Sequence, residues 1–201
     1  DGVPLSDYDP GDLRLRIGMV PQDSFLFSDT IADNIGLGLD LNDPLLSESG
    51  RPADVLVTAA RLAQLHDQIE EFPTGYGTIL GERGINLSGG QKQRATLARA
   101  IARDPLILVL DDSLSAVDTH TEAQILEDLR QVMNDRTSFI ISHRVSAVMH
   151  ADRILVLDAG TIAERGTHIE LLAADGTYAR LLRRQLLEEV LESEIAAVAG
   201  E

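Results

Sequence analysis

A fully apolar run that ends in two acids constrains the fold of this chain more than any other segment. Residues Leu106–Leu110 contain only leucine, isoleucine and valine, and they lead directly into Asp111 and Asp112. Strands of this composition are usually buried on both faces, inside a parallel sheet. The run therefore predicts an α/β core with two carboxylates at the carboxyl edge of its sheet, where open α/β folds bind their ligands.

Strands and helices alternate around this run, as a parallel α/β core requires. Further strands are expected at Leu15–Val20 and Ser138–Ile141, the second also buried, and a hairpin is expected where Ile154–Leu157 and Thr161–Ala163 flank Asp158-Ala159-Gly160. Leu37–Arg51 is rich in turn residues and reads as a loop. Helices are expected at Thr30–Ile35, from Pro52 to about Pro73, at Gln91–Arg103, from a capping box at Thr119-x-x-Glu122, at Val145–His150, and twice at the end, the last from about Tyr178 past Glu192.

Composition excludes several classes of function. The 201 residues include 17 basic and 33 acidic side chains, a net charge of -16, which argues against nucleic acid or an anionic membrane surface as the main partner. There is no cysteine, so disulfides and thiol chemistry are excluded. No apolar stretch approaches the ~20 residues needed to cross a bilayer, and the first residues do not form a signal peptide. We expect a soluble, cytoplasmic chain, and a fragment, because a strand begins so early.

The run Leu87-Ser88-Gly89-Gly90-Gln91 stands at the start of an expected helix. A helix N-terminus exposes unpaired N–H groups and a partial positive charge, and so it binds phosphate. Two glycines let the backbone approach an anion, and the serine hydroxyl adds a donor. The alternative is an ordinary capping box, since Ser88-x-x-Gln91 fits that pattern too.

The acids after the apolar strand are candidates for metal binding and catalysis. Asp111 would hold Mg²⁺, partly through water, because Mg²⁺ keeps several of its own waters. Asp112 would align or deprotonate an attacking water. The alternative is a polar turn that ends a buried strand.

Three further polar residues stand at positions suited to a nucleotide site. Gln22 follows a strand end and could reach Mg²⁺ or its water, and His143 follows Ser138–Ile141 and could contact a γ-phosphate or the attacking water. Asp118 ends the short segment Ser115-Ala116-Val117-Asp118 after the acidic pair. Their alternatives are a solvated loop glutamine, a surface histidine and a helix cap.

The usual phosphate-binding loop is absent from these 201 residues. No Gly-x-x-x-x-Gly-Lys-Ser/Thr sequence occurs, and the nearest match, Gly84 to Gly89, continues with Gly90 and Gln91.

The order Gln22, Leu87–Gln91, Asp111-Asp112, Asp118 and His143 resembles the nucleotide-binding domain of an ATP-binding cassette (ABC) exporter, of the subfamily that exports lipids, drugs or peptides. Arg16–Asp23, Leu26–Ile35 and Gly81–Gly84 are also typical of that subfamily. The resemblance implies a P-loop NTPase-like (RecA-like) parallel-sheet core, incomplete here, with an α-helical signature subdomain over about 27–98 and a C-terminal helical tail over 175–201.

The resemblance also implies ligands and partners. Two such domains would pair head to tail around two ATP molecules with Mg²⁺, at the cytoplasmic face of a membrane, and drive a transmembrane domain. Leu87–Gln91 would contact a nucleotide held by the partner. Gln22 and Asp111 would bind Mg²⁺, and Asp112 and His143 would act in hydrolysis.

Two departures from the family pattern refine this expectation. Family members usually carry glutamate at position 112, where this chain has aspartate, and Thr78-Ile79-Leu80 replaces their Thr-Glu-Val. The missing phosphate-binding loop implies that this chain binds ATP weakly or not at all by itself. The aspartate at position 112, beside an intact signature run, suggests the degenerate half of a heterodimer. The alternatives are an ABC ATPase of DNA repair or chromosome organisation, which usually has long heptad coiled coils that are absent here, and a non-catalytic regulatory domain.

Overall fold

The computed structural model describes residues 2–39, 51–82 and 86–199. The chain divides into two compact units, Asp1–Ile141 and Ser142–Glu201. Most of the expected loop Leu37–Arg51 and part of the Gly81–Gly84 run lie outside the described residues. The expected boundaries of the helical subdomain and of the helical tail stay predictions. Within the described ranges, no helix has the length and apolarity needed to cross a bilayer.

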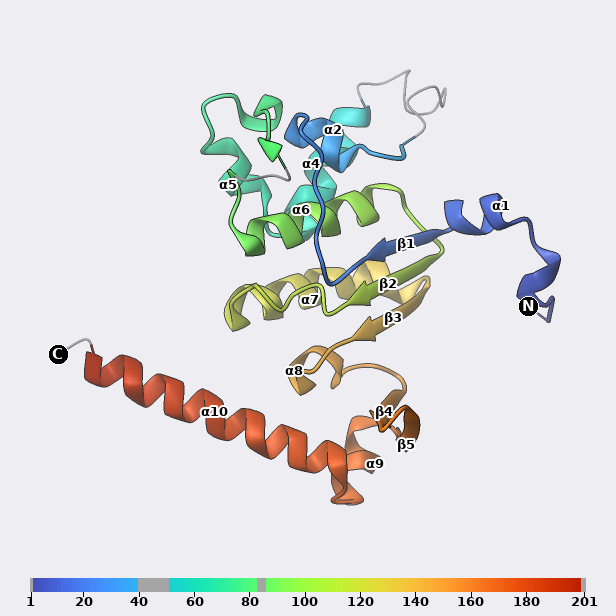
Figure 1. Cartoon of the computed structure of the whole chain (residues 1–201), viewed down its shortest axis with the longest axis vertical. Helices are drawn as coiled ribbons and strands as arrows, with labels where there is room; N and C mark the ends of the chain where they lie inside the picture. The colour runs from blue at the N-terminus through green and yellow to red at the C-terminus, as the bar shows by residue number, and fades with distance from the viewer. Residues whose placement is uncertain (1, 40–50, 83–85, 200–201) are drawn as a thin grey trace. The chain divides into compact units, whose positions relative to one another are not determined.

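A parallel three-stranded sheet forms the centre of the first unit (Figure 1). Its strands are β1 (Ile17–Val20), β2 (Ile107–Asp111) and β3 (Thr137–Ile141), in the order β1-β2-β3. The apolar run thus forms the middle strand, and the predicted parallel α/β core is confirmed.

The sheet is buried on one face rather than on two. Leu108 and Leu110 are buried, but the aligned row Met19, Val109 and Phe139 lies on the other face, where Phe139 is 56% exposed. The predictions that β2 is buried on both faces and that β3 is buried are therefore wrong. The physical reason is that the core formed with the described helices of the first unit includes Leu108 and Leu110, on one face of the sheet, while β3 lies at its edge.

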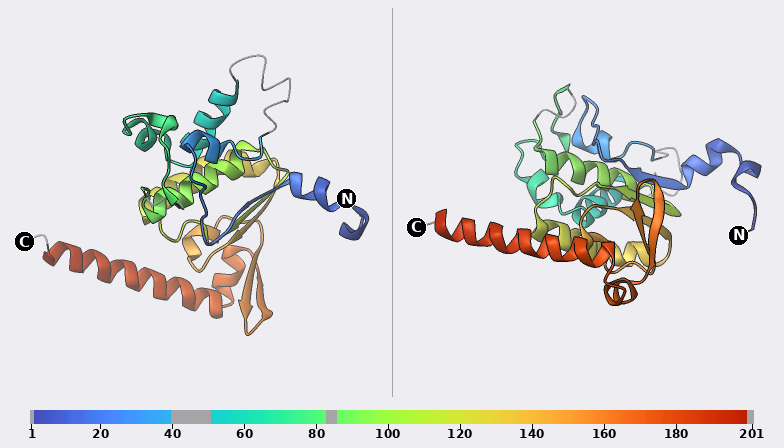
Figure 2. Two further views of the ribbon diagram at one scale, coloured as in Figure 1. Left: turned by 45° about the horizontal axis from the view of Figure 1, so that its top comes forward. Right: turned by 60° about the horizontal axis from the view of Figure 1, so that its bottom comes forward.

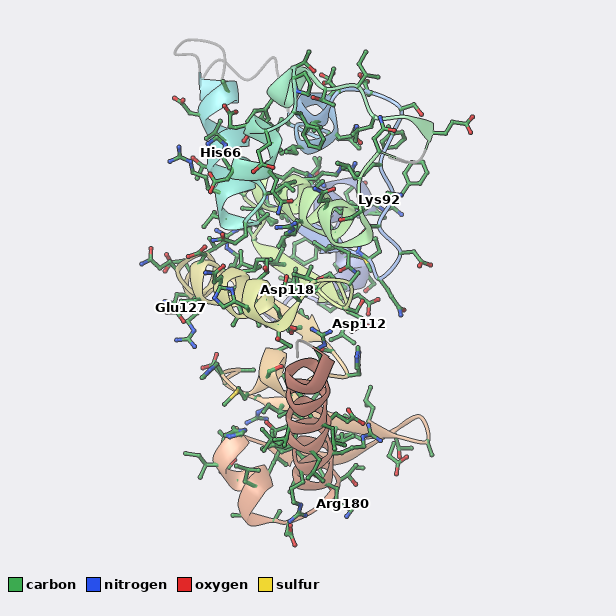
Figure 3. The ribbon with its side chains drawn as sticks, turned by 90° about the vertical axis from the view of Figure 1, so that its left-hand side faces the viewer. His66, Lys92, Asp112, Asp118, Glu127 and Arg180 are labelled. Carbon is green, nitrogen blue, oxygen red and sulfur yellow. The ribbon has the colours of Figure 1, made fainter. Side chains whose placement is uncertain are left out.

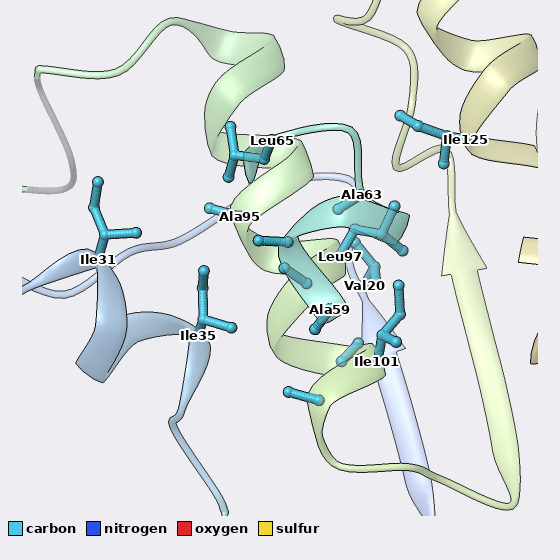
Figure 4. Close-up of a cluster of buried hydrophobic side chains, with 14 of the residues drawn as sticks. Val20, Ile31, Ile35, Ala59, Ala63, Leu65, Ala95, Leu97, Ile101 and Ile125 are labelled. Atoms are coloured by element: carbon cyan, nitrogen blue, oxygen red, sulfur yellow. The ribbon is translucent and has the colours of Figure 1, made fainter. Parts of the chain in front are cut away.

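Helices cover the buried face of the sheet. The described helical elements of this unit are η1 (Leu5–Asp7), α1 (Pro10–Leu15), α2 (Ile31–Ile35), α4 (Arg51–Leu62), α5 (His66–Glu70), η2 (Gly75–Gly77), α6 (Gly89–Ala102) and α7 (Thr119–Asn134). One hydrophobic core includes Val20 of β1, Ala59 of α4, Ala63 immediately after α4, and Leu97 and Ile101 of α6 (Figure 4). The small alanines permit close packing of α4 against α6, which fixes α6 over the sheet.

Two elements begin or end elsewhere than predicted. The strand expected from Leu15 begins at Ile17, because Asp9 caps a short helix that starts at Pro10. The single helix expected from Pro52 to about Pro73 is two helices, α4 and α5, because Gln64 adopts the left-handed backbone conformation (φ 52°) between them.

The second unit contains a hairpin and three helices, α8 (Val145–Val148), α9 (His168–Ala173) and α10 (Thr177–Ala199) (Figure 2). The hairpin pairs β4 (Ile154–Asp158) with β5 (Thr161–Gly166) antiparallel. Ala159 and Gly160 have positive φ values (46° and 76°), the conformation of a type I′ hairpin turn. The predicted hairpin and closing helices are confirmed.

Candidate nucleotide-binding site

Two of the predicted ligand residues lie at the same edge of the sheet. Asp111 is the last residue of β2, and Gln22 stands two residues after the end of β1. Because β1 and β2 are parallel and Val20 pairs with Leu110, both side chains begin at the carboxyl edge of the sheet. Gln22 is exposed and Asp111 half-buried. The structure thus places both residues at one sheet edge, and their roles toward a ligand stay predictions.

Asp112, which is labelled in Figure 3, follows β2 immediately and has a strained backbone conformation. Its φ is 44°, in the left-handed region that aspartate tolerates better than most side chains do. The Asp112 amide donates to the carbonyl of Ile141 (2.8 Å), and its carbonyl accepts from the Ser115 amide (3.3 Å) and the Ser115 hydroxyl (2.9 Å). The backbone at position 112 is therefore held from both sides.

The signature run, Leu87–Gln91, begins helix α6 with a complete capping box. The Ser88 hydroxyl accepts from the Gln91 amide (3.2 Å), and the Gln91 side-chain oxygen accepts from the Ser88 amide (2.9 Å). Leu87 is buried in the core below. The capping interpretation is confirmed. It leaves the N–H groups of Gly89 and Gly90 in the first turn, where a helix has no carbonyl to receive them, so phosphate binding stays a compatible prediction.

The second glycine of the run is sterically required, and the first is not. A Cβ on Gly90 would lie 2.8 Å from the carbonyl oxygen of Ala116, whereas one on Gly89 would lie 3.5 Å from the Ala116 Cβ, an ordinary contact. Gly90 therefore brings the start of α6 against the loop that follows Asp112.

Asp118 ends this loop as the N-cap of α7. Its carboxylate accepts from the Thr121 amide (2.9 Å), and this bond lowers the pKa of the exposed Asp118 carboxyl. The predicted capping box at Thr119-x-x-Glu122 is wrong, because Asp118 lies one residue earlier and takes the cap position itself. Its alternative role as a helix cap is confirmed.

His143 is the second residue of the second unit and is exposed. The Ser142 hydroxyl accepts from the Arg144 amide (3.0 Å), next to it, and the Val145 amide donates to the side chain of Gln185 (2.8 Å). Its contact with a γ-phosphate stays a prediction.

Sequence reasoning missed the buried polar side chains along α6. Gln93 and Arg94 are 5% and 8% exposed. Arg94 donates to the Gln64 carbonyl (2.6 Å) and to the Gln68 side chain (2.8 Å), which also accepts from Gln91 (3.1 Å). Burial lowers the pKa of Arg94, opposed by the charge of Asp118. Polar residues on an otherwise buried helix are the signal that could have identified Gln93 and Arg94, because buried residues occur on nearly all sides of α6.

Arg99, a turn and more further along α6, contacts the segment that follows Gln22. Its guanidinium donates to the carbonyl of Phe25 (2.9 Å), to the carbonyl of Asn34 (2.8 Å) and to the Asn34 side-chain oxygen (2.9 Å). It also lies 5.8 Å from the centre of the Phe27 ring. Helix α6 is thus bonded to the segment that follows β1 and, through Gln93, to the loop that follows β2.

The donor set at this edge fits Mg²⁺ held jointly with a nucleotide. Within the described ranges, no group of three or more His, Asp or Glu side chains could hold a metal ion without other ligands. Asp111 and Gln22 offer carboxylate and amide oxygens, which Mg²⁺ accepts, and Mg²⁺ usually completes its shell with water and substrate phosphates. Two protein ligands are therefore sufficient for a Mg²⁺ ion that also binds nucleotide and water, but they are too few to hold the ion by themselves.

A parallel sheet with an acid at its carboxyl edge, beside a helix that begins Ser-Gly-Gly-Gln, defines an ATP-binding cassette domain. The chain belongs to the ABC transporter family, whose model matches residues 1–115. The predicted family and the predicted P-loop NTPase-like fold with an α-helical signature subdomain are confirmed.

The similar proteins are ABC transporter components. The uncharacterized ABC transporter ATP-binding protein YknU of Bacillus subtilis (strain 168) is 49% identical over 181 residues, 90% of this chain and 29% of that protein. The ATM1-type heavy metal exporter of Novosphingobium aromaticivorans is 43% identical over 196 residues, 98% of this chain and 31% of its own length. A solved bacterial Atm1-family ABC exporter with ATP bound matches with a TM-score of 0.82 and 43% identity, over 90% of this chain and 30% of that one. The chain spans less than a third of these relatives.

Proposed function

We propose that this chain is part of the nucleotide-binding domain of an ABC exporter and couples ATP binding and hydrolysis to transport. It pairs head to tail with a second nucleotide-binding domain and works on a transmembrane domain at the cytoplasmic face of the membrane. The observation that carries the proposal is the start of α6, where exposed Ser88 and Gly89 lead into Gly90, packed on the loop after Asp112. The exporters among the relatives support transport over DNA-repair or chromosome-organising roles.

Each residue has a defined task in this proposal. Bound ATP supplies the phosphoanhydride bond that is broken, with Mg²⁺ balancing its charge. Gln22 and Asp111 orient Mg²⁺ from the sheet edge, and Asp112 orients or deprotonates the attacking water. His143 donates a hydrogen bond toward the γ-phosphate.

The signature run and Asp118 serve the partner domain. The first turn of α6 directs its N–H groups and partial positive charge at phosphates that the partner holds. Asp118, at the end of the loop that packs against Gly90, lies at the same contact.

We propose further that this chain is the degenerate half of a heterodimer. Aspartate is one methylene shorter than glutamate, so the carboxylate at position 112 is drawn back by about 1.5 Å. Misplacing a catalytic group by ~1 Å can cost on the order of a hundredfold in rate. The left-handed backbone at Asp112 favours aspartate and is consistent with a residue selected for the loop rather than for catalysis.

ATP turnover by the complete exporter with Asp112→Glu tests this proposal. We expect the rate to rise, because the longer side chain restores the reach of the base. Asp112→Asn is the matched control: it keeps the left-handed preference and removes the base, so it should not raise the rate. If Asp112→Glu leaves turnover unchanged and the wild-type protein hydrolyses ATP rapidly as a homodimer, the proposal fails.

A second measurement concerns the chain without its partner. No Gly-x-x-x-x-Gly-Lys-Ser/Thr loop occurs in its 201 residues. We therefore expect no ATP turnover by this polypeptide and only weak binding by calorimetry, and tight binding would contradict the proposed division of the site.

A further inference from the structure

Gln93 is a buried amide that has no part in the proposed contacts with nucleotide. It lies on α6, two residues past the signature run, and is 5% exposed. A buried amide is costly unless its polar atoms are hydrogen-bonded. Its partners lie 22 and 23 residues away, in the loop that follows Asp112.

Two hydrogen bonds fix the orientation of the Gln93 side chain. Its Nε2 donates to the Ser115 hydroxyl (3.1 Å), and its Oε1 accepts from the Ala116 amide (2.9 Å). Exchanging the two atoms would bring an NH₂ group against the N–H of Ala116, so only one orientation satisfies both partners. Both hydrogen bonds of Gln93 therefore require this conformation of the loop.

The hydrogen bonds continue to the backbone of Asp112. The Ser115 hydroxyl, which accepts from Gln93, donates its proton to the Asp112 carbonyl (2.9 Å). Asp112 is in the left-handed conformation, which persists only where the surroundings hold it. Gly90 packs against the Ala116 carbonyl, so α6 and the loop are in close contact at this point.

We propose that Gln93 is a positioning residue that couples the signature helix to Asp112. The inference rests on the proposed function, in which Ser88–Gln91 serve the partner's nucleotide and Asp112 serves the site framed by this chain. A displacement of the start of α6 shifts Gln93, then the Ser115 hydroxyl, and then the Asp112 carbonyl. Two successive hydrogen bonds thereby link the two sites of the dimer, and the bond from the Ala116 amide to Gln93 holds the loop beside them.

Hydrogen exchange in the complete protein without nucleotide tests the link, read by mass spectrometry on the peptide that spans Ser113–Asp118. Gln93→Met keeps the shape of the side chain and removes both bonds, so we expect the Ala116 amide to exchange roughly fivefold faster. Gln93→Glu keeps an acceptor for that amide, so its protection should return to within about twofold of wild type.

A double-mutant cycle tests whether Gln93 acts through Ser115. Ser115→Ala removes the bond to the Asp112 carbonyl. Each single variant increases the exchange rate of this peptide by some factor. In the double variant, Gln93→Met with Ser115→Ala, we expect an increase smaller than the product of those two factors, because both changes break one network. Independent effects would overturn the proposed path.

Thr96→Val is the matched control on the same helix. Thr96 is buried and its hydroxyl donates within α6, to the Lys92 carbonyl (3.0 Å). We expect it to leave the exchange of Ser113–Asp118 unchanged. An equal increase in Thr96→Val and Gln93→Met, or none in Gln93→Met, would overturn the inference. These outcomes do not depend on ATP turnover, so a failure of the Asp112→Glu experiment is distinguishable from a failure here.

Discussion

Helices α6 and α9 begin with the same local device in different surroundings. In α6 the pair is Ser88 and Gln91, and in α9 it is Thr167 and Glu170, each a capping box with both reciprocal hydrogen bonds. Both pairs follow the pattern Ser/Thr-x-x-Glu/Gln. By this motif, the two helix starts are equivalent.

What differs is how far their polar side chains reach. Hydrogen bonds from α6 join Arg94 to Gln64 and Arg99 to Phe25, separations of 30 and 74 residues. Around α9 the bonds stay within neighbouring elements, for example His168 to Tyr178, 10 residues apart. A capping motif therefore identifies where a helix begins, while the long-range bonds identify the helix around which a site is built.

The largest expected effect comes from removing a long-range bond of α6. Arg99→Ala deletes three hydrogen bonds to Phe25 and Asn34, from a guanidinium whose pKa burial lowers. We expect about 3 kcal/mol less free energy of unfolding in urea, because buried acceptors lose a charged donor. Arg180→Ala, which removes an exposed arginine bonded to Thr177, should cost under about 0.5 kcal/mol. Arg180 and Thr177 both lie on α10, so equal costs would remove the contrast between the long-range bonds of α6 and a local bond of the second unit.

Adjacent glycines at the start of α6 give the next effect. A Cβ at Gly90 meets the Ala116 carbonyl at 2.8 Å, so Gly90→Ala must displace backbone, and we expect a loss of about 2 kcal/mol in the same unfolding assay. Gly89→Ala meets only ordinary contact and should stay within about 0.5 kcal/mol of wild type, since alanine also favours helix. If Gly89→Ala is the more damaging change, the packing of α6 on the loop is not the cause.

The same contrast explains what the sequence could predict. The middle strand, the start of α6 and the hairpin turn at Ala159 and Gly160 follow from short patterns of apolar, capping and turn residues. The break at Gln64 has no such pattern, because glutamine rarely marks a left-handed turn. The exposure of Phe139 depends on what packs against the sheet, which periodicity does not encode.

The site divides in the same way. The sequence predicts that Gln22 and Asp111 each follow a strand, and the structure places both at one sheet edge. The contacts of Gln93 were not predictable, because its partners lie 22 residues away and depend on the loop conformation. The ligand roles of all these residues stay predictions.

The two caps should contribute equally when each is removed at neutral pH. Ser88→Ala and Thr167→Ala each delete the acceptor for one first-turn amide, that of Gln91 or Glu170. We expect each to cost about 1 kcal/mol of unfolding free energy, the usual value for an N-cap. A cost at Ser88 several times that at Thr167 would mean that loss of the α6 cap also disturbs the long-range bond from Gln91 to Gln68.

The smallest effect separates the two caps by pH. Glu170 accepts from the Thr167 amide (2.8 Å) and hydroxyl (3.1 Å), bonds that hold the pKa of the Glu170 carboxyl below its usual value, with the charge of Arg153 assisting. A lowered folded-state pKa stabilises the cap at pH values above the unfolded-state pKa, and this contribution is lost as the pH falls through the folded-state pKa.

The α6 cap has no ionisable group. On acidification from about pH 6 to about pH 3, a range that brackets the ordinary glutamate pKa, we expect the exchange protection of the Thr167 amide to fall while that of Ser88 stays constant. Glu170→Gln, which keeps the acceptor and removes the charge, should abolish the difference. A parallel fall at both amides would instead report acid unfolding of the whole chain, and the two helix starts would then be energetically alike.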